Sequence, residues 1–124
     1  MRNLTLLTDL YQLTMMNGYY EKNIHEDIVV FDMFFRKNAC DGGYTIICGI
    51  EQLAEYINNL HFSDDDLDYL RSLNLFSEGF LNFLKDFKFT GDIYAVEEGT
   101  VMFPGEPIIT VKAPLYQARS EERR

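Results

Sequence analysis

The fold is decided by residues 91–111, Gly-Asp-Ile-Tyr-Ala-Val-Glu-Glu-Gly-Thr-Val-Met-Phe-Pro-Gly-Glu-Pro-Ile-Ile-Thr-Val. Short apolar segments alternate here with turns that contain Gly99 and the pair Pro104 and Gly105. Glycine permits positive φ and proline fixes φ, so both are typical of tight turns between strands. The pattern predicts a small β-meander or a hammerhead-like hairpin unit. The expected strands are residues 91–96, 100–103 and 108–111.

Residues 28–36, upstream of this segment, predict a further strand. They are rich in β-branched and aromatic side chains on both alternating faces, so we expect a strand covered on both sides. Gly42 and Gly43 predict a turn. Residues 44–48 are then expected to form a short strand that pairs with the preceding one.

Helices are expected where apolar residues recur at spacings of three and four. Thr8 or Asp9 can cap the first helix, because a short side-chain oxygen accepts hydrogen bonds from free backbone N–H groups. Ser63 and Asp66 match an acidic capping box at the start of another helix. The expected helices are residues 8–22 and 50–60, one that follows Ser63 and one that follows Ser77.

Composition and charge exclude several classes of protein. The chain has 124 residues and a formal net charge of −9, which disfavours a broad basic face for nucleic acid. No apolar run approaches the roughly 20 residues of a membrane span, and the N-terminus has no secretory signal pattern. Cys40 and Cys48 have no metal-ligand spacing, so we expect reduced thiols in a cytoplasmic protein.

Common catalytic motifs are absent from the sequence. It contains no GxxxxGK[ST] phosphate loop, no GxGxxG fingerprint and no GxSxG elbow. His25 and His61 have polar neighbours and are expected at the surface. The acidic run at residues 64–66 indicates a solvated helix start, because adjacent aspartates on one helix do not converge on a metal ion.

Two short segments carry candidate binding groups. Asp9 and Tyr11 lie at an expected helix start, where Tyr11 can offer a flat ring and a hydroxyl. Arg36 and Lys37 are adjacent cations at the end of an expected strand, and arginine can bind a phosphate or carboxylate through two parallel hydrogen bonds. The structural alternatives are a core aromatic residue and a solvated strand end.

Several blocks, in matching order and spacing, resemble the start of nicotinate phosphoribosyltransferases, over about residues 4–118. They are Leu-Leu-Thr-Asp-Leu-Tyr-Gln-Leu-Thr-Met at 6–15, Phe-Asp-Met-Phe-Phe-Arg-Lys-Asn at 31–38, Gly-Gly-Tyr at 42–44, Phe-Thr-Gly-Asp at 89–92 and Glu-Gly-Thr-Val-Met-Phe-Pro-Gly-Glu-Pro at 98–107.

The resemblance implies an α+β fold, the α/β-hammerhead-like N-terminal domain of a type II phosphoribosyltransferase, with helices packed on a small mixed or antiparallel sheet. It implies one domain at residues 1–118 and a charged, frayed tail at 119–124. The family's longer enzymes add an irregular α/β barrel, which carries the phosphorylated histidine and most phosphate-binding loops. The chain resembles only the N-terminal domain, and its end after Ala118 resembles a truncated, frameshifted or degenerate form of the longer sequence.

The resemblance also implies activity and site residues. The family couples nicotinate to phosphoribosyl pyrophosphate in NAD biosynthesis, using ATP and Mg²⁺, in homodimers whose N-terminal domain completes the partner's site. Tyr11 would stack on nicotinate with Asp9 beside it, and Arg36, with Lys37 as the weaker candidate, would bind the diphosphate or phosphoribosyl group. No catalytic residue, metal ligand or cofactor site of its own is expected, so the chain alone should be inactive.

An alternative is a non-catalytic fragment that self-associates or regulates a full-length relative by pairing with it. Loss of a barrel should uncover apolar surface, and exposed apolar patches promote association. A biotinyl or lipoyl carrier is disfavoured, because Lys112, the nearest lysine, ends a strand and does not lie at a hairpin tip.

Overall fold

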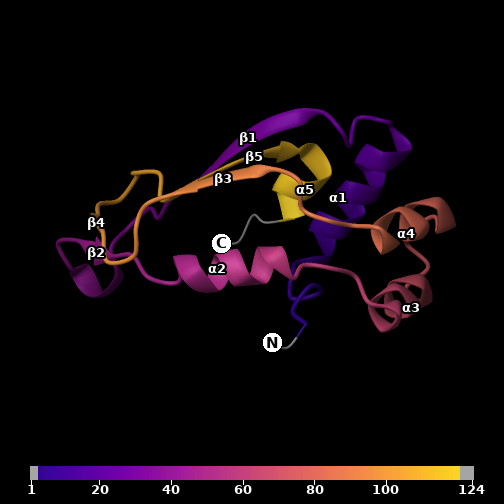
Figure 1. Ribbon diagram of the computed structural model, residues 1–124, viewed down its shortest axis with the longest axis horizontal. Helices are drawn as coiled ribbons and strands as arrows, with labels where there is room; N and C mark the ends of the chain where they lie inside the picture. Colours follow the sequence, from indigo (N-terminus) through magenta and orange to yellow (C-terminus); the bar gives the residue numbers. More distant parts are fainter. Residues whose placement is uncertain (1–2, 121–124) are drawn as a thin grey trace.

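The computed structural model describes residues 3–120, in which helices and small antiparallel sheets confirm the expected α+β class (Figure 1). The helices are α1 (Leu10–Glu21), α2 (Ile50–Asn58), α3 (Asp64–Ser72), α4 (Glu78–Lys85) and α5 (Leu115–Ser120). The strands are β1 (Ile28–Met33), β2 (Thr45–Ile46), β3 (Asp92–Ala95), β4 (Val101–Met102) and β5 (Ile109–Pro114), and the 3-10 turn η1 (Ala39–Asp41) lies between β1 and β2. Residues 121–124 of the expected tail lie outside the described residues.

β5 is the central strand of a three-stranded sheet and pairs antiparallel with β1 on one side and β3 on the other. The expected meander is wrong, because β4 leaves this sheet and pairs with β2. Two backbone hydrogen bonds hold the turn before β4 in this position. Gly99 N donates to Ile47 O (2.8 Å), and Ile47 N donates to Thr100 O (2.9 Å). The expected pairing of residues 44–48 with the preceding strand is therefore wrong as well.

One face of the three-stranded sheet forms an apolar core with α2 and the β2–β4 ribbon. Phe31, Val111 and Ile93 lie in one cross-strand row on this face. Figure 1 shows α2 running below the sheet, and Ile50 and Leu53 of α2 pack in the same cluster. The buried members of this cluster are Ile47, Met102, Ile108 and Ile109.

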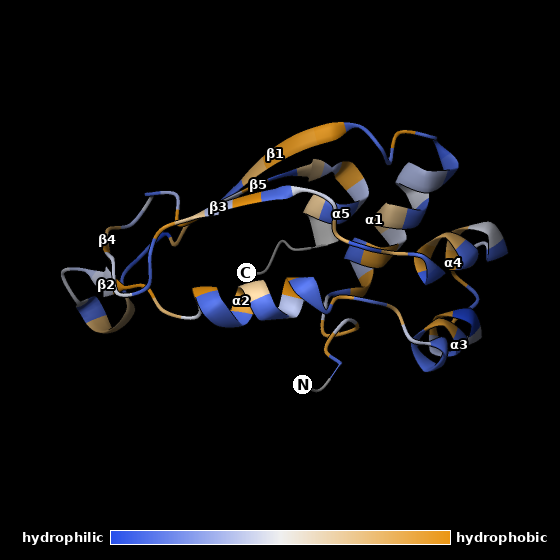
Figure 2. Ribbon diagram, viewed as in Figure 1, coloured by the Kyte–Doolittle hydropathy of each residue, from blue (hydrophilic) through white to orange (hydrophobic). Residues whose placement is uncertain are grey.

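The other face of β1 is exposed, so the expectation that this strand is covered on both sides is wrong. Ile28 is 61% exposed and Val30 is 59% exposed. Figure 2 shows apolar colouring along most of β1. β1 also ends at Met33, three residues earlier than expected, because its partner β5 extends only to Ile109.

A second core joins α1, α3, α4 and α5. Its most deeply buried side chains are Met16, Leu70, Phe80, Leu81 and Leu84. The expectation that His25 is a surface residue is wrong, because its side chain is only 13% exposed and its ring packs against Tyr20, Phe83 and Tyr116. His61 is exposed, as expected.

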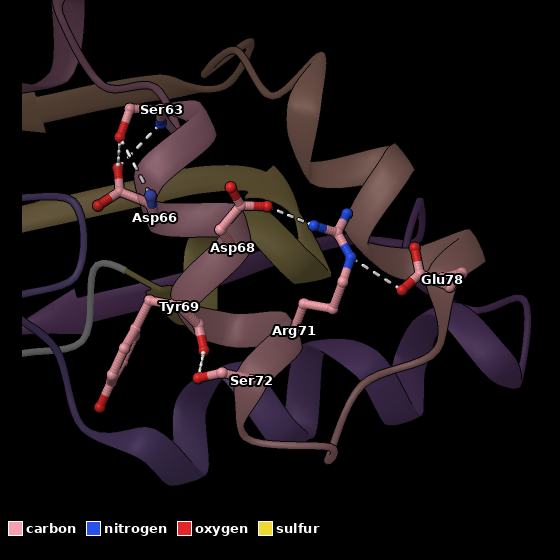
Figure 3. Close-up of polar contacts among 7 residues, drawn as sticks. All are labelled: Ser63, Asp66, Asp68, Tyr69, Arg71, Ser72 and Glu78. Carbon is pink, nitrogen blue, oxygen red and sulfur yellow. Dashed lines mark hydrogen bonds and ion pairs between the residues drawn. The ribbon is translucent and has the colours of Figure 1, made fainter.

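The helix starts at Ser63, drawn in Figure 3, and at Ser77 confirm the sequence prediction. The Ser63 hydroxyl accepts from the amide of Asp66 (3.2 Å), and the Asp66 carboxylate accepts from the amide of Ser63 (2.8 Å), which forms a capping box. Arg71 of α3 binds Asp68 on its own helix and Glu78 at the start of α4. Its pKa is raised above its ordinary value by the hydrogen bond to Glu78 and by that carboxylate's charge.

Candidate functional site

Asp9 and Tyr11 lie where α1 begins. Asp9 occupies the N-cap position with an extended backbone, but its carboxylate accepts no capping hydrogen bond. The Thr8 hydroxyl bonds to the side chain of Gln12. α1 therefore begins two residues later than the expected range 8–22, and the prediction that the side chain of Thr8 or Asp9 caps the helix is wrong.

The ring of Tyr11 is accessible from solvent. Tyr11 is 40% exposed, so the alternative in which it is a core aromatic residue is excluded. Asp9, one position before the first residue of α1, is also exposed. The start of α1 thus carries an exposed aromatic side chain and an exposed carboxylate two positions apart.

Arg36 and Lys37 lie in the segment between β1 and η1, and both are exposed. Within residues 3–120, neither side chain makes a hydrogen bond or an ion pair. The backbone on either side is anchored, because Phe35 O accepts from Gly105 N (2.9 Å) and the Asn38 side chain accepts from the Thr45 hydroxyl (3.1 Å). The two cations therefore project from a held segment.

The structure keeps Asp9 with Tyr11 and Arg36 with Lys37, but it does not join the two pairs. α1 packs against α4 and α5, whereas the segment that carries Arg36 is bonded to the β2–β4 ribbon and the turn before β5. In the part of the chain that the structure describes, no hydrogen bond or ion pair links the two groups. The chain therefore presents an aromatic group and a cationic group as two separate accessible features.

The residues that hold Arg36 and Lys37 were missed by the sequence analysis. Pro104 and Gly105 indicated only a turn, and Thr45 indicated only strand propensity. Long-range bonds such as those from Gly105 to Phe35 depend on which strands pair. Because the sequence analysis paired residues 44–48 with the wrong strand, it could not predict these bonds.

Glu98 was also missed. Its carboxylate accepts from the backbone amides of Gly49 (2.9 Å) and Glu51 (3.3 Å) at the start of α2. The positive end of the helix dipole stabilises a carboxylate there. This contact joins the β3–β4 turn to α2 and fixes the base of the β2–β4 ribbon.

A cavity of about 280 Å³ lies between the N-terminal segment and the end of α2. It contains none of the predicted site residues. Its lining residues are Asn3, Leu4, Thr5, Glu55, Tyr56, Asn59, Leu60 and His61. Among the described residues, no group of three or more His, Cys, Asp or Glu side chains could hold a metal ion, and no helix has the length and apolar character needed to cross a bilayer.

The β2–β4 ribbon has one apolar face in solvent. Ile46 faces Val101 across the ribbon, and Tyr44 immediately precedes β2 while Phe103 immediately follows β4. The exposed fractions are Tyr44 57%, Ile46 56%, Val101 47% and Phe103 51%. We call these four side chains the ribbon face.

Comparison with known proteins identifies the class of this α+β domain. The family model described as the nicotinate phosphoribosyltransferase N-terminal domain matches residues 6–122. The chain belongs to that family.

Individual relatives agree with this assignment. The chain is 39% identical over 117 residues to nicotinate phosphoribosyltransferase pncB2 of Mycobacterium tuberculosis, covering 94% of this chain and 25% of that protein. It is 40% identical over 117 residues to nicotinate phosphoribosyltransferase of Bacillus subtilis, covering 94% of this chain and 24% of that protein. The crystal structure of human nicotinic acid phosphoribosyltransferase superposes with a TM-score of 0.82 at 28% identity, over 91% of this chain and 23% of that one. The chain thus spans about a quarter of the length of the curated relatives it matches.

Proposed function

We propose that this chain supplies the N-terminal part of a nicotinate phosphoribosyltransferase active site. The carrying observation is that Tyr11 and Arg36, which lie in the family-matched residues, are both exposed and uncommitted to the core. The reaction joins nicotinate to phosphoribosyl pyrophosphate and yields nicotinate mononucleotide and pyrophosphate, a step of NAD biosynthesis assisted by ATP and Mg²⁺. The two free thiols, Cys40 and Cys48, support a cytoplasmic location.

The nicotinate side of the pocket is proposed to contain Tyr11 and Asp9. A pyridine ring can stack on the exposed phenol ring, an arrangement that contributes about 0.5–1.5 kcal/mol beyond burial of area. The Asp9 carboxylate repels the carboxylate of nicotinate, so we place it toward the ring edge, which carries partial positive charge.

The phosphate side is proposed to contain Arg36 and Lys37. A guanidinium can donate two parallel hydrogen bonds to a diphosphate, and the adjacent ammonium adds a point charge. The chain has a net charge of −9, so two adjacent cations without an ion-pair partner among the described residues form a local site that can attract an anion.

The chain alone is proposed to be inactive. Acceleration of group transfer requires reactants to be positioned and developing charge to be stabilised by several converging groups. Tyr11 lies on α1 and Arg36 lies between β1 and η1, and a barrel from a longer enzyme or a second chain is proposed to complete the pocket between them. A homodimer in which each N-terminal domain completes the partner's site is the proposed assembly.

Two assays test this proposal. The purified chain, given nicotinate, phosphoribosyl pyrophosphate, ATP and Mg²⁺, is expected to form no nicotinate mononucleotide. A chimera in which this chain replaces the matching N-terminal quarter of the Bacillus subtilis relative is expected to form it. Product from the chain alone would contradict the proposed dependence on a barrel.

The second candidate is a non-catalytic fragment that self-associates or pairs with a full-length relative. The ribbon face favours it, because these four large apolar side chains on and beside the ribbon are all exposed. Light scattering over a range of concentrations tests it, with Ile46→Lys as the variant and Ile24→Lys, an exposed isoleucine away from the ribbon, as the control. A monomer at all concentrations would exclude self-association.

A further inference from the structure

The segment that carries Arg36 and Lys37 continues β1 without being part of its ladder. Met33 O accepts from Ile108 N (2.8 Å), and two residues later Phe35 O accepts from Gly105 N (2.9 Å). These bonds carry the chain past the end of the sheet and set the backbone direction immediately before Arg36.

The Gly105 amide is available for this bond because of the turn in which it lies. Glu106 N donates to Phe103 O (3.2 Å), and the Glu106 carboxylate accepts from Phe103 N (2.8 Å), which closes the turn from both sides. Pro104 suits the second position of such a turn, and Gly105 has φ +84° at the third. A Cβ at Gly105 would meet nothing within 4 Å, so the backbone conformation, and not space, requires glycine there.

The other side of the segment is held by a side-chain bond. The Thr45 hydroxyl donates to the Asn38 side-chain oxygen (3.1 Å), and both residues are half-buried. Thr45 faces the buried Met102 across the β2–β4 ribbon. The bond therefore ties the residue after Lys37 to a packed element.

We propose that Thr45 and Gly105 are positioning residues that hold Arg36 and Lys37 in one orientation for a diphosphate. We call the two bonds, Gly105 N to Phe35 O and Thr45 Oγ1 to Asn38 Oδ1, the basic-pair clamp. Long cationic side chains lose much freedom when they bind, and a backbone fixed beforehand reduces that loss. The inference rests on the proposed function, because the clamp matters for binding only if the two cations contact an anion.

The first test needs no ligand. Nitrogen-15 relaxation of the 124-residue chain is expected to give backbone order parameters of about 0.85 for Arg36 and Lys37, the value of rigid backbone. Thr45→Val keeps the shape of the side chain and removes the donor, and we expect the two values to fall toward about 0.6. Gly105→Ala, strained at positive φ, should lower them in the same way.

Thr100→Val is the matched control. It removes a threonine hydroxyl bond of similar length, to Glu97 O (2.7 Å), from the turn at the other end of β4. It should leave the order parameters of Arg36 and Lys37 unchanged. Unchanged values in both Thr45→Val and Gly105→Ala would overturn the clamp, whatever the thermal stability of the variants.

The second test uses inorganic pyrophosphate as the probe, followed by chemical shifts of the Arg36 side-chain N–H and the Lys37 amide. Thr45→Val is expected to weaken binding by about two- to tenfold, the effect of losing one net hydrogen bond from the competent state, while Thr100→Val binds like the wild type. Arg36→Ala is expected to abolish the response of the Lys37 amide, the probe that this variant retains.

The outcomes separate the two claims. If Arg36→Ala abolishes binding and Thr45→Val does not weaken it, the clamp is wrong and the assignment of Arg36 stands. If pyrophosphate gives no shift changes in the wild type, or Arg36→Ala binds normally, the assignment of Arg36 is contradicted, and the clamp has no anion to position even where the order parameters fall.

Discussion

The side-chain oxygen of Gln117, a residue with no exposed surface, accepts a 2.8 Å hydrogen bond from the backbone amide of Thr90. The Gln117 amide nitrogen in turn donates to the hydroxyls of Thr90 (3.1 Å) and Tyr116 (2.7 Å). One buried side chain therefore joins α5 to the segment that enters β3. The family-like block at 89–92 is thus joined to α5 through Gln117.

Replacement of Gln117 by Leu is expected to destabilise the chain by about 1–3 kcal/mol. The substitution leaves the Thr90 amide without this acceptor in a partly buried position, and an unsatisfied polar group costs about that much. Urea unfolding followed by circular dichroism measures it. Gln52→Leu, at an exposed position of α2, is the control and should change stability by less than about 0.5 kcal/mol.

Gly91→Ala is expected to destabilise the chain by about 3 kcal/mol or more, or to prevent folding, because overpacking is costly. A Cβ at Gly91 would lie 2.3 Å from Ala113 Cβ and 2.7 Å from Lys112 O on the central strand. Gly18→Ala in α1 meets nothing within 4 Å, so it should stabilise by about 0.5–1 kcal/mol. Thermal unfolding of the two variants should shift in opposite directions, and a shared direction would contradict the close approach at Gly91.

Ser63→Ala is expected to cost about 1 kcal/mol, the usual effect of removing an N-cap. The variant loses the bond from Asp66 N and half of the capping box. Ser72→Ala removes only a hydroxyl that bonds to Tyr69 O at the end of the same helix (Figure 3). Chemical unfolding should separate the two serines, and equal effects would argue against the box.

Tyr116 should make the chain sensitive to alkaline pH. Burial raises the pKa of its phenol above 10.0, the hydrogen bond from Gln117 opposes this, and the charge of Glu26 adds to it. Since the folded-state pKa is the higher one, the stabilising contribution is complete below the unfolded pKa of about 10 and falls as pH rises through the folded value.

Tyr116→Phe removes this titration. The free energy of unfolding of the wild type, measured with urea from pH 8 upward, should fall relative to that of the variant above about pH 10. A constant difference between the two proteins across this range would contradict the assignment. The remaining tyrosines are common to both proteins and cancel in the comparison.

Local patterns predicted the helices well. Ser63, Asp66 and Ser77 act within a few residues of their own amides, so their capping bonds depend little on the rest of the fold. The strands were predicted less well, because two-residue strands such as β2 and β4 have partners that are chosen by long-range contacts, among them the bonds from Gly99 N to Ile47 O and from Ile47 N to Thr100 O. Neither the hydrophobic periodicity nor the residue types of the turns determines which of these strands pair.

The contrast between local patterns and long-range contacts also applies to the candidate site and the surface. The exposed positions of Tyr11 and Arg36 agree with the sequence prediction, but their separation on different elements depends on tertiary contacts. The apolar composition of β1 predicted a covered strand, yet its outer face is exposed because no described element lies over it. His25 looked polar in sequence but packs among aromatic rings supplied by three helices.

The central claim is that Tyr11 and Arg36 bind different substrates. The most direct test is to measure KM for nicotinate and KM for phosphoribosyl pyrophosphate in variants of the chimera with the Bacillus subtilis relative. Tyr11→Ala should raise KM for nicotinate by about three- to tenfold, the equivalent of one lost ring stack. It should leave KM for phosphoribosyl pyrophosphate unchanged, and Tyr11→Phe should behave like the wild type. Arg36→Ala should raise KM for phosphoribosyl pyrophosphate by about tenfold or more and leave nicotinate unaffected.

Tyr69→Ala, an exposed tyrosine on α3, is the matched control and should change neither value. An active chimera in which Tyr11→Ala and Arg36→Ala leave both KM values at the level of Tyr69→Ala would contradict the claim that these two side chains bind the substrates.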